Sequence, residues 1–202
     1  MEFTPSNLSH SELYGLILNA VAPRPIAWVS TLSASGHPNL APFSFFNAVC
    51  IDPPVLAFAP GLRHGEAKDT LRNVRETKEF VVNIVTYDLA EKMNLTAGDY
   101  DASINEFDLA QIATAPSQVV KVPRVAASPV SFECKLHQIV DFSASPESSH
   151  LVLGQVVAIH VDDAHMKDGK LDRNSLDLIG RMGGIQYTRT TQRFDMVRPK
   201  VE

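Results

Sequence analysis

The sequence predicts a mainly β protein, an antiparallel barrel with a few peripheral helices. Short β-branched and aromatic segments follow one another along the chain, turn residues separate them, and helical patterns do not alternate regularly with them. With 202 residues, 45% of them hydrophobic, the chain can bury a core without disulfides or metals. We therefore expect one domain over residues 1–202.

Turn residues bound the expected strands. Ile26–Leu32 is followed by a turn at 33–38, in which Gly36 allows a positive φ. Asn39–Cys50 is expected to be one strand, and its Pro42 predicts a bulge or an edge position. Further strands are expected at Val55–Ala59, Phe80–Val85, Val130–Leu136, Leu151–Val161 and Gly184–Arg189.

Three helices are expected around these strands. The first lies near Leu13–Ala20, and Asp69 or Thr70 is expected to cap the second. The third is expected to begin with a capping box of Asp88 and Glu91 and to end at Gly98.

Residues 25–51 contain no Asp, Glu, Lys or Arg, although the overall frequency of 20% predicts about five in a stretch of this length. Its prolines, glycine and polar residues exclude a membrane helix. The stretch combines neutral hydrogen-bonding groups with aromatic side chains: Ser30, Thr31, Asn39, Ser44 and Asn47 with Trp28, Phe43, Phe45 and Phe46. This combination suits a pocket for a planar heterocycle, and it equally suits a pair of core strands with polar turns.

Two further patches suggest an anion site. Arg63, His64 and Lys68 precede the expected helix N-terminus at Asp69 and Thr70, where free N–H groups favour a phosphate. A solvated charged loop with a helix cap gives the same pattern. Near the C-terminus, Arg181 precedes Gly183 and Gly184, which allow close backbone approach or positive φ; this is typical of an anion contact or of a surface turn.

Several classes of function are excluded or lack a signature. A net charge of −5 argues against nucleic acid as the main partner. The N-terminus lacks a signal peptide, which predicts a cytoplasmic protein with Cys50 and Cys134 as buried free thiols. The sequence has no glycine-rich nucleotide motif, no nucleophile elbow and no local metal motif. The chemistry is therefore expected to belong to a bound cofactor, with no metal.

Taken in order, these patches resemble the flavin reductase-like family of FMN-binding split barrels, which is associated with flavoprotein oxygenases. The resemblance covers roughly residues 13–190. Its motifs are Arg24-Pro-Ile with Val29-Ser-Thr, Asn39-Leu-Ala-Pro-Phe-Ser-Phe-Phe-Asn47, Asp52-Pro-Pro, Lys68-Asp-Thr, Glu133-Cys, His150 with Gly154, and Arg181-Met-Gly-Gly-Ile-Gln-Tyr187.

The resemblance implies a Greek-key barrel that forms a homodimer, with FMN near the subunit interface. It implies flavin contacts from Ser30, Thr31, Ser44, Phe45, Phe46 and Asn47, and contacts to the ribityl phosphate from Lys68, Asp69 and Thr70. Arg24 and Arg181 are further cofactor-binding candidates. The catalytic residues are unknown, with His150 as the one candidate, although the structural role of a strand-opening histidine is the alternative.

The implied function is an FMN-dependent oxidoreductase. It would pass hydride from NADH or NADPH to FMN, and electrons onward to a partner oxygenase, to oxygen or to another acceptor. The first alternative is a flavoredoxin-like electron carrier without a nicotinamide site. The second is an FMN-binding module without pyridine-nucleotide activity.

Overall fold

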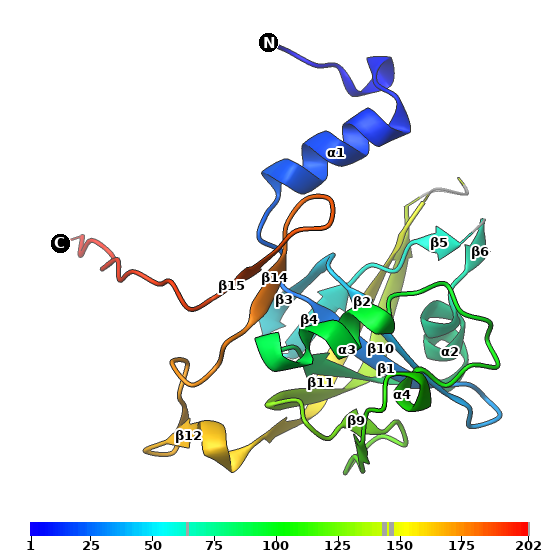
Figure 1. The fold of residues 1–202 in the computed structure, drawn as a ribbon, viewed down its shortest axis with the longest axis vertical. Helices are drawn as coiled ribbons and strands as arrows, with labels where there is room; N and C mark the ends of the chain where they lie inside the picture. The colour runs from blue at the N-terminus through cyan, green and yellow to red at the C-terminus, as the bar shows by residue number, and fades with distance from the viewer. Residues whose placement is uncertain (64, 143–144, 146–147, 202) are drawn as a thin grey trace.

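In the computed structural model, which describes residues 1–63, 65–142, 145 and 148–201, seven strands form one antiparallel sheet that curves into a barrel (Figure 1). The strands are β1 (Ala27–Leu32), β2 (Pro38–Phe43), β3 (Phe46–Ile51), β4 (Pro54–Phe58), β7 (Glu79–Ile84), β10 (Val130–Asp141) and β11 (His150–Val161). Their order is β2-β1-β7-β10-β11-β4-β3. The prediction of a mainly β, antiparallel fold is confirmed.

The strands β2 and β3 follow each other in sequence but lie at opposite ends of the sheet order. The prediction of one strand over residues 39–50 is therefore wrong, because the chain leaves the sheet at Ser44 and Phe45 and re-enters it at the other end. We call these two residues the seam. The edge position predicted for Pro42 is confirmed, since β2 is a terminal strand and tolerates a residue without an N–H.

Both faces of the sheet are covered around β1. Val29 belongs to the cluster inside the barrel, where the rings of Phe43, Phe58 and Phe80 pack with centroids 5.2 and 5.3 Å apart. On the other face, Trp28 packs among residues of the helical segments and donates from Nε1 to Thr96 Oγ1 at 2.9 Å. Two-sided burial explains why this part of the chain carries no charge.

The helices lie outside the barrel (Figure 1). They are α1 (His10–Ala20), α2 (Asp69–Thr77), α3 (Ala90–Leu95) and α4 (Glu106–Leu109), with 3₁₀ turns η1 (Pro5–Asn7), η2 (Tyr87–Leu89) and η3 (Asp163–His165). The helix α1 begins with a capping box of Ser9 and Glu12. The short α4 was not predicted; its first-turn residues Glu106 and Phe107 are buried.

Three predicted helix ends are wrong. Lys68 is the N-cap of α2, because Asp69 and Thr70 already lie inside the helix; Asp69 pairs with Arg72 instead. Asp88 lies in η2 and makes no capping box, and α3 ends at Leu95 rather than at Gly98.

The remaining strands are two- or three-residue hairpin arms: β5 (Leu62–Arg63), β6 (Glu66–Ala67), β8 (Thr114–Ala115), β9 (Arg124–Val125), β12 (Met166–Lys167), β13 (Lys170–Leu171), β14 (Ile179–Arg181) and β15 (Tyr187–Arg189). The last strand begins at Tyr187 instead of the predicted Gly184, because Gly184 has a φ of 56° and belongs to the turn. Gly36 has the expected positive φ of 85°.

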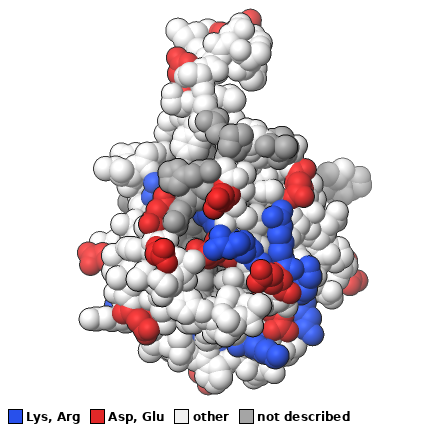
Figure 2. Space-filling model, turned by 90° about the vertical axis from the view of Figure 1, so that its right-hand side faces the viewer, with Lys and Arg blue, Asp and Glu red and all other residues white. Residues whose placement is uncertain are grey.

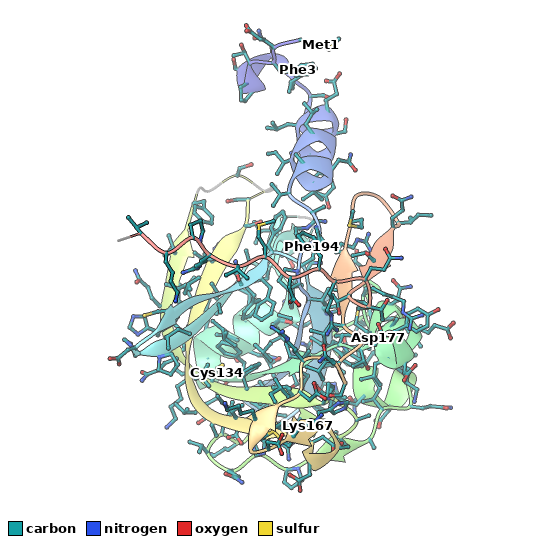
Figure 3. All side chains as sticks on the ribbon, turned by 90° about the vertical axis from the view of Figure 1, so that its left-hand side faces the viewer. Met1, Phe3, Cys134, Lys167, Asp177 and Phe194 are labelled. Atoms are coloured by element: carbon teal, nitrogen blue, oxygen red, sulfur yellow. The ribbon has the colours of Figure 1, made fainter. Side chains whose placement is uncertain are left out.

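The ends of the chain extend from the barrel. Figure 3 shows α1 standing above it and the segment that carries Phe194, which has no regular secondary structure, running across the view. Cys134 is buried, but Cys50 is exposed because it lies on the terminal strand β3, so the prediction of two buried thiols is wrong for Cys50. None of the helices in the described ranges is long and apolar enough to cross a membrane.

A buried carboxylate holds the segment 116–122 against β10. The side chain of Glu133 is fully buried and accepts hydrogen bonds from the N–H groups of Gln118, Val119 and Val120 at 2.6–2.9 Å. His160 Nε2 lies 2.5 Å from Glu133 Oε1. Burial raises the pKa of Glu133, but the hydrogen bonds outweigh burial and lower it from 4.5 to about 2.

The depressed pKa of Glu133 predicts an acid-dependent loss of stability. Its contribution, about 3 kcal/mol from the pKa difference, is complete above pH 4.5 and is lost as the pH falls toward 2. Urea unfolding at pH 7 and at pH 3 measures this loss. Glu133→Gln should remove most of the difference between the two pH values, whereas Glu76→Gln on the exposed face of α2 should leave it unchanged. An identical acid response in wild type and Glu133→Gln would contradict the assignment.

Candidate functional site

A pocket of about 800 Å³ lies between α1 and the seam. We call it the larger pocket. Phe43, Ser44 and Phe45 form one wall, and Tyr14 and Ile17 of α1 form another. Of the described residues that line it, none is Asp, Glu, Lys or Arg. Its volume falls within the range of small-molecule sites, and its walls combine aromatic rings with the neutral Ser44 hydroxyl.

Arg24 joins three parts of the molecule at one end of this pocket. It is buried, and its guanidinium donates to the carbonyl oxygens of Leu18 and Val21 in and after α1, and to that of Met182 after β14. Its Nε lies 3.5 Å from Ser44 Oγ in the pocket wall. Burial and the nearby charge of Arg181 lower the pKa of Arg24, although an arginine stays protonated.

The β14–β15 hairpin packs against the same end of α1 (Figure 1). The main chains of Arg24 and Arg181 exchange two hydrogen bonds at 2.8 and 2.9 Å. Gly183 approaches α1 so closely that a Cβ there would lie 1.7 Å from Asn19 Oδ1. The paired glycines therefore serve both expected purposes, close approach at Gly183 and positive φ at Gly184.

A second, smaller pocket of about 50 Å³ lies at the N-terminus of α2. Lys68, Asp69 and Thr70, which were expected to contact a phosphate, line it together, and their phosphate contacts stay predictions. Pro42 and Phe43 line both pockets, so the two pockets are neighbours along the end of β2. Figure 2 shows basic and acidic side chains gathered together on the side of the molecule that carries α2.

An internal hydrogen-bond network fixes the start of α2 against the barrel. Asn39 Nδ2 donates to Thr31 Oγ1 at 3.3 Å and to Thr70 Oγ1 at 3.0 Å. Asn73 Nδ2 donates to the same Thr31 oxygen at 3.0 Å. The Thr31 hydroxyl therefore holds α2 in place, and with it the wall of the smaller pocket.

Glu106 also lines the smaller pocket, and sequence reasoning missed it. It is 8% exposed, and its Oε2 accepts the N–H of Leu40 on the terminal strand β2 at 3.0 Å. Burial, together with the negative charge of Asp69, raises the pKa of Glu106 against the opposing effects of two backbone hydrogen bonds and of His37. A buried carboxyl group with a raised pKa thus lies beside the predicted phosphate position.

Other predicted site residues lie outside the two pockets. The Ser30 hydroxyl is buried and donates to the carbonyl of Pro123 at 2.7 Å. Phe46 packs against the barrel core, and the Asn47 side chain accepts the N–H of Ala48. Arg181 donates to Tyr187 and Gly184 and stacks over the Tyr187 ring. Their flavin contacts stay predictions.

His150 lies next to the larger pocket rather than in its wall. Its Nδ1 is 2.5 Å from Asp141 Oδ1, and Arg75 Nη2 lies within 3.3 Å of both residues. The hydrogen bond with His150 lowers the pKa of Asp141. The neighbouring Ser149 lines the pocket. His64, predicted near the phosphate, lies outside the described residues.

The residues that sequence reasoning did not assign to a site come mostly from α1 and from the segment after β4: Leu13, Tyr14, Ile17, Gly61, Leu62 and Ser149. The i, i+4 spacing of Leu13 and Ile17 marks one face of a helix, but it does not indicate which surface that face covers.

Comparison with known proteins decides the family. The model of the flavin reductase like domain matches residues 20–175. The chain belongs to the flavin reductase like family. A relative from Aquifex aeolicus (strain VF5) is 40% identical over 191 residues, which cover 94% of this chain and 95% of the relative. The protein YwrF of Bacillus subtilis (strain 168) is 34% identical and is covered over 98% of its length, as is this chain.

Two solved structures of this flavin reductase like fold are similar over nearly the whole chain. Nitrilotriacetate monooxygenase component B from Bacillus cereus superposes with a TM-score of 0.93 at 29% identity, over 97% of this chain and 98% of its own. The 2-nitrobenzoate 2-nitroreductase NbaA of Pseudomonas fluorescens gives a TM-score of 0.89 at 35% identity, over 98% and 96% respectively. The predicted split-barrel, flavin reductase-like fold is thereby confirmed.

Replacing Arg24 by lysine should release α1 from the barrel. A single ammonium group cannot reproduce a planar fork that donates to three carbonyls, and each hydrogen bond to a charged group contributes about 1.5–3 kcal/mol. Hydrogen exchange of residues 10–20 should become at least tenfold faster, while β7 and β10 keep their protection. The control is Arg173→Lys at an exposed arginine. Unchanged protection of α1 in Arg24→Lys would show that the guanidinium does not anchor the helix.

Proposed function

We propose that this flavoprotein-family chain is an FMN-dependent oxidoreductase, which accepts electrons from NADH or NADPH and passes them to a partner oxygenase or another acceptor. We further propose that it acts as a single domain over residues 1–202, as a homodimer in the cytoplasm. The observation that carries the proposal is that a neutral pocket with aromatic walls and a pocket at a helix N-terminus share Pro42 and Phe43. A mononucleotide needs this pair of sites, one for a flat ring and one for a phosphate.

The residues of both pockets fit FMN. Phe43 and Phe45 supply apolar surface for the isoalloxazine ring, and the Ser44 hydroxyl supplies a neutral hydrogen-bonding group. In the smaller pocket, the Lys68 ammonium and the N-terminus of α2 favour a phosphate. Bound FMN would supply the redox chemistry, because it accepts two electrons as hydride and gives them up one or two at a time.

The protein's own contribution is to position the two reactants and exclude water. The larger pocket has a volume of about 800 Å³, and α1 borders it. Hydride transfer needs close contact between donor and acceptor and no acid or base from the protein. This agrees with a pocket whose described lining has no carboxylate or ammonium group.

The oxygenase partner and the homodimer have separate support. The name of the similar Bacillus cereus protein, component B of a monooxygenase, suggests transfer to an oxygenase component. Residues Asn47–Ile51 of β3 are exposed, with Val49 at 55% and Ile51 at 83%, and Tyr14 and Ile17 of α1 are also exposed. Apolar surface of this extent on a terminal strand and a projecting helix favours a second copy as its cover.

Absorbance spectroscopy of the purified protein with FMN, followed by addition of NADH or NADPH, tests the proposal. We expect a bound flavin spectrum that bleaches with either nucleotide and recovers in air. Bound FMN that only a protein donor reduces would favour the electron carrier, and bound FMN that exchanges electrons with no donor would favour the binding module. Failure to bind FMN would contradict all three.

Lys68→Ala should weaken FMN binding more than tenfold, because it removes the ammonium group of the smaller pocket. Riboflavin, which has no phosphate, should bind both variants equally. Fluorescence titration with each flavin measures the two affinities. Lys78→Ala, at the C-terminal end of α2, is the matched control. An unchanged FMN affinity would remove Lys68 from the phosphate site.

A further inference from the structure

The smaller pocket carries more negative than positive charge, although its predicted ligand is an anion. Asp69, Asp99 and Glu106 line it together with Lys68. Asp69 forms an ion pair with Arg72. Glu106 differs from the other two acids because it is nine-tenths buried and accepts hydrogen bonds from uncharged main-chain N–H groups. An ionised Glu106 beside a phosphate would be unfavourable in a buried position.

The titratable groups around Glu106 come from every neighbouring element. Lys68 and Asp69 approach from the start of α2, Asp99 and Tyr100 from the segment after α3, and His37 from the turn before β2. On α4 itself, Asp108 faces away from this pocket and accepts a hydrogen bond from Asn105. Lys68 is thus the only Lys or Arg among the described lining residues.

We propose that Glu106 determines both the anion affinity of the smaller pocket and its dependence on pH. In its protonated form the carboxyl group donates a hydrogen bond to a phosphate oxygen, and in its ionised form it repels the phosphate. Both the protonated and the ionised carboxyl group can accept a hydrogen bond from the Leu40 N–H. A change in the protonation of Glu106 therefore leaves this contact in the fold intact. The inference rests on the proposed function, since it takes the phosphate of FMN as the ligand.

The sign of the effect follows from linkage. A phosphate dianion favours the protonated carboxyl, so binding takes up a proton when Glu106 is ionised in the free protein. The FMN dissociation constant of the wild type should therefore rise with pH above the pKa of Glu106, by up to tenfold per pH unit. The raised pKa of Glu106 brings this change closer to neutral pH than an exposed glutamate would.

The decisive experiment compares wild type with Glu106→Gln in FMN titrations from pH 5 to pH 9. Glutamine is isosteric with the protonated acid and can accept the Leu40 N–H through its amide oxygen. We expect the two affinities to converge toward the acidic end of this range and a tenfold or greater advantage of Glu106→Gln at pH 9. The second ionisation of the phosphate, near pH 6, affects both proteins equally and cancels from this ratio.

Controls separate the phosphate effect from other changes. Asp108→Asn removes the same charge from the same helix outside the pocket and should follow the wild-type profile. Riboflavin should show no difference between wild type and Glu106→Gln at any pH. A ratio that stays constant with pH, or an equal effect on riboflavin, would overturn the role of Glu106.

Two further measurements test the role of Glu106, the first without a variant and the second without a flavin. Calorimetry of the wild type in two buffers of different ionisation enthalpy, at the pH where its FMN affinity falls most steeply with pH, should show proton uptake with FMN and none with riboflavin; no uptake there would contradict the proposal. Inorganic phosphate should raise the thermal unfolding temperature of Glu106→Gln more than that of wild type at pH 9. If FMN does not bind, the proposed function fails, and the phosphate result still decides for or against Glu106.

Discussion

The site depends on one constraint, the passage of the chain from one end of the sheet to the other at Ser44 and Phe45. Because β2 and β3 are consecutive but not paired, these two residues leave the ladder, and their side chains face a pocket instead of the core. A main-chain hydrogen bond of 2.8 Å from Ala59 to Phe45 ties the crossing to the end of β4. The pocket wall therefore consists of backbone-fixed residues, which suits a site that must hold a ring in one place.

The buried cation Arg24 connects this wall to the two segments that project from the barrel. Burying a guanidinium is unfavourable unless its donors are satisfied, and here carbonyl oxygens in and after α1 and after β14 accept hydrogen bonds from it. Met182 lies 158 residues from Arg24 in the sequence, so the guanidinium holds α1 and the C-terminal hairpin in a single arrangement. A hydrophobic residue could fill the space but could not define the position of α1, which buries only Leu18 of its own residues.

The sequence predicts the strands well where burial is two-sided and poorly where tertiary contacts decide. Trp28 and Val29 lie in a continuous apolar run between turn signals, and their strand is found where expected. Residues 39–50 have the same apolar character, but nothing local shows that the chain changes sheet ends at Ser44. Likewise, Lys68 and Thr70 are found at the predicted helix start, whereas Glu106 joins them through a fold contact with Leu40 that lies 66 residues away in sequence.

The distribution of charge along the chain is explained by the two pockets together. Under the proposed function the larger pocket needs no charge, because apolar surface and a hydroxyl group would hold a neutral ring; its walls come mainly from the charge-free stretch and α1. The smaller pocket, as the proposed phosphate site, has one ammonium group and three carboxyl groups in its described lining. Since Asp69 is paired with Arg72, and Asp99 lies on a surface segment where water screens it, the buried Glu106 is the carboxyl whose charge matters most to an anion. The Leu40 N–H of the terminal strand β2 fixes its position, so the edge of the sheet itself places a proton-binding group beside the proposed anion site.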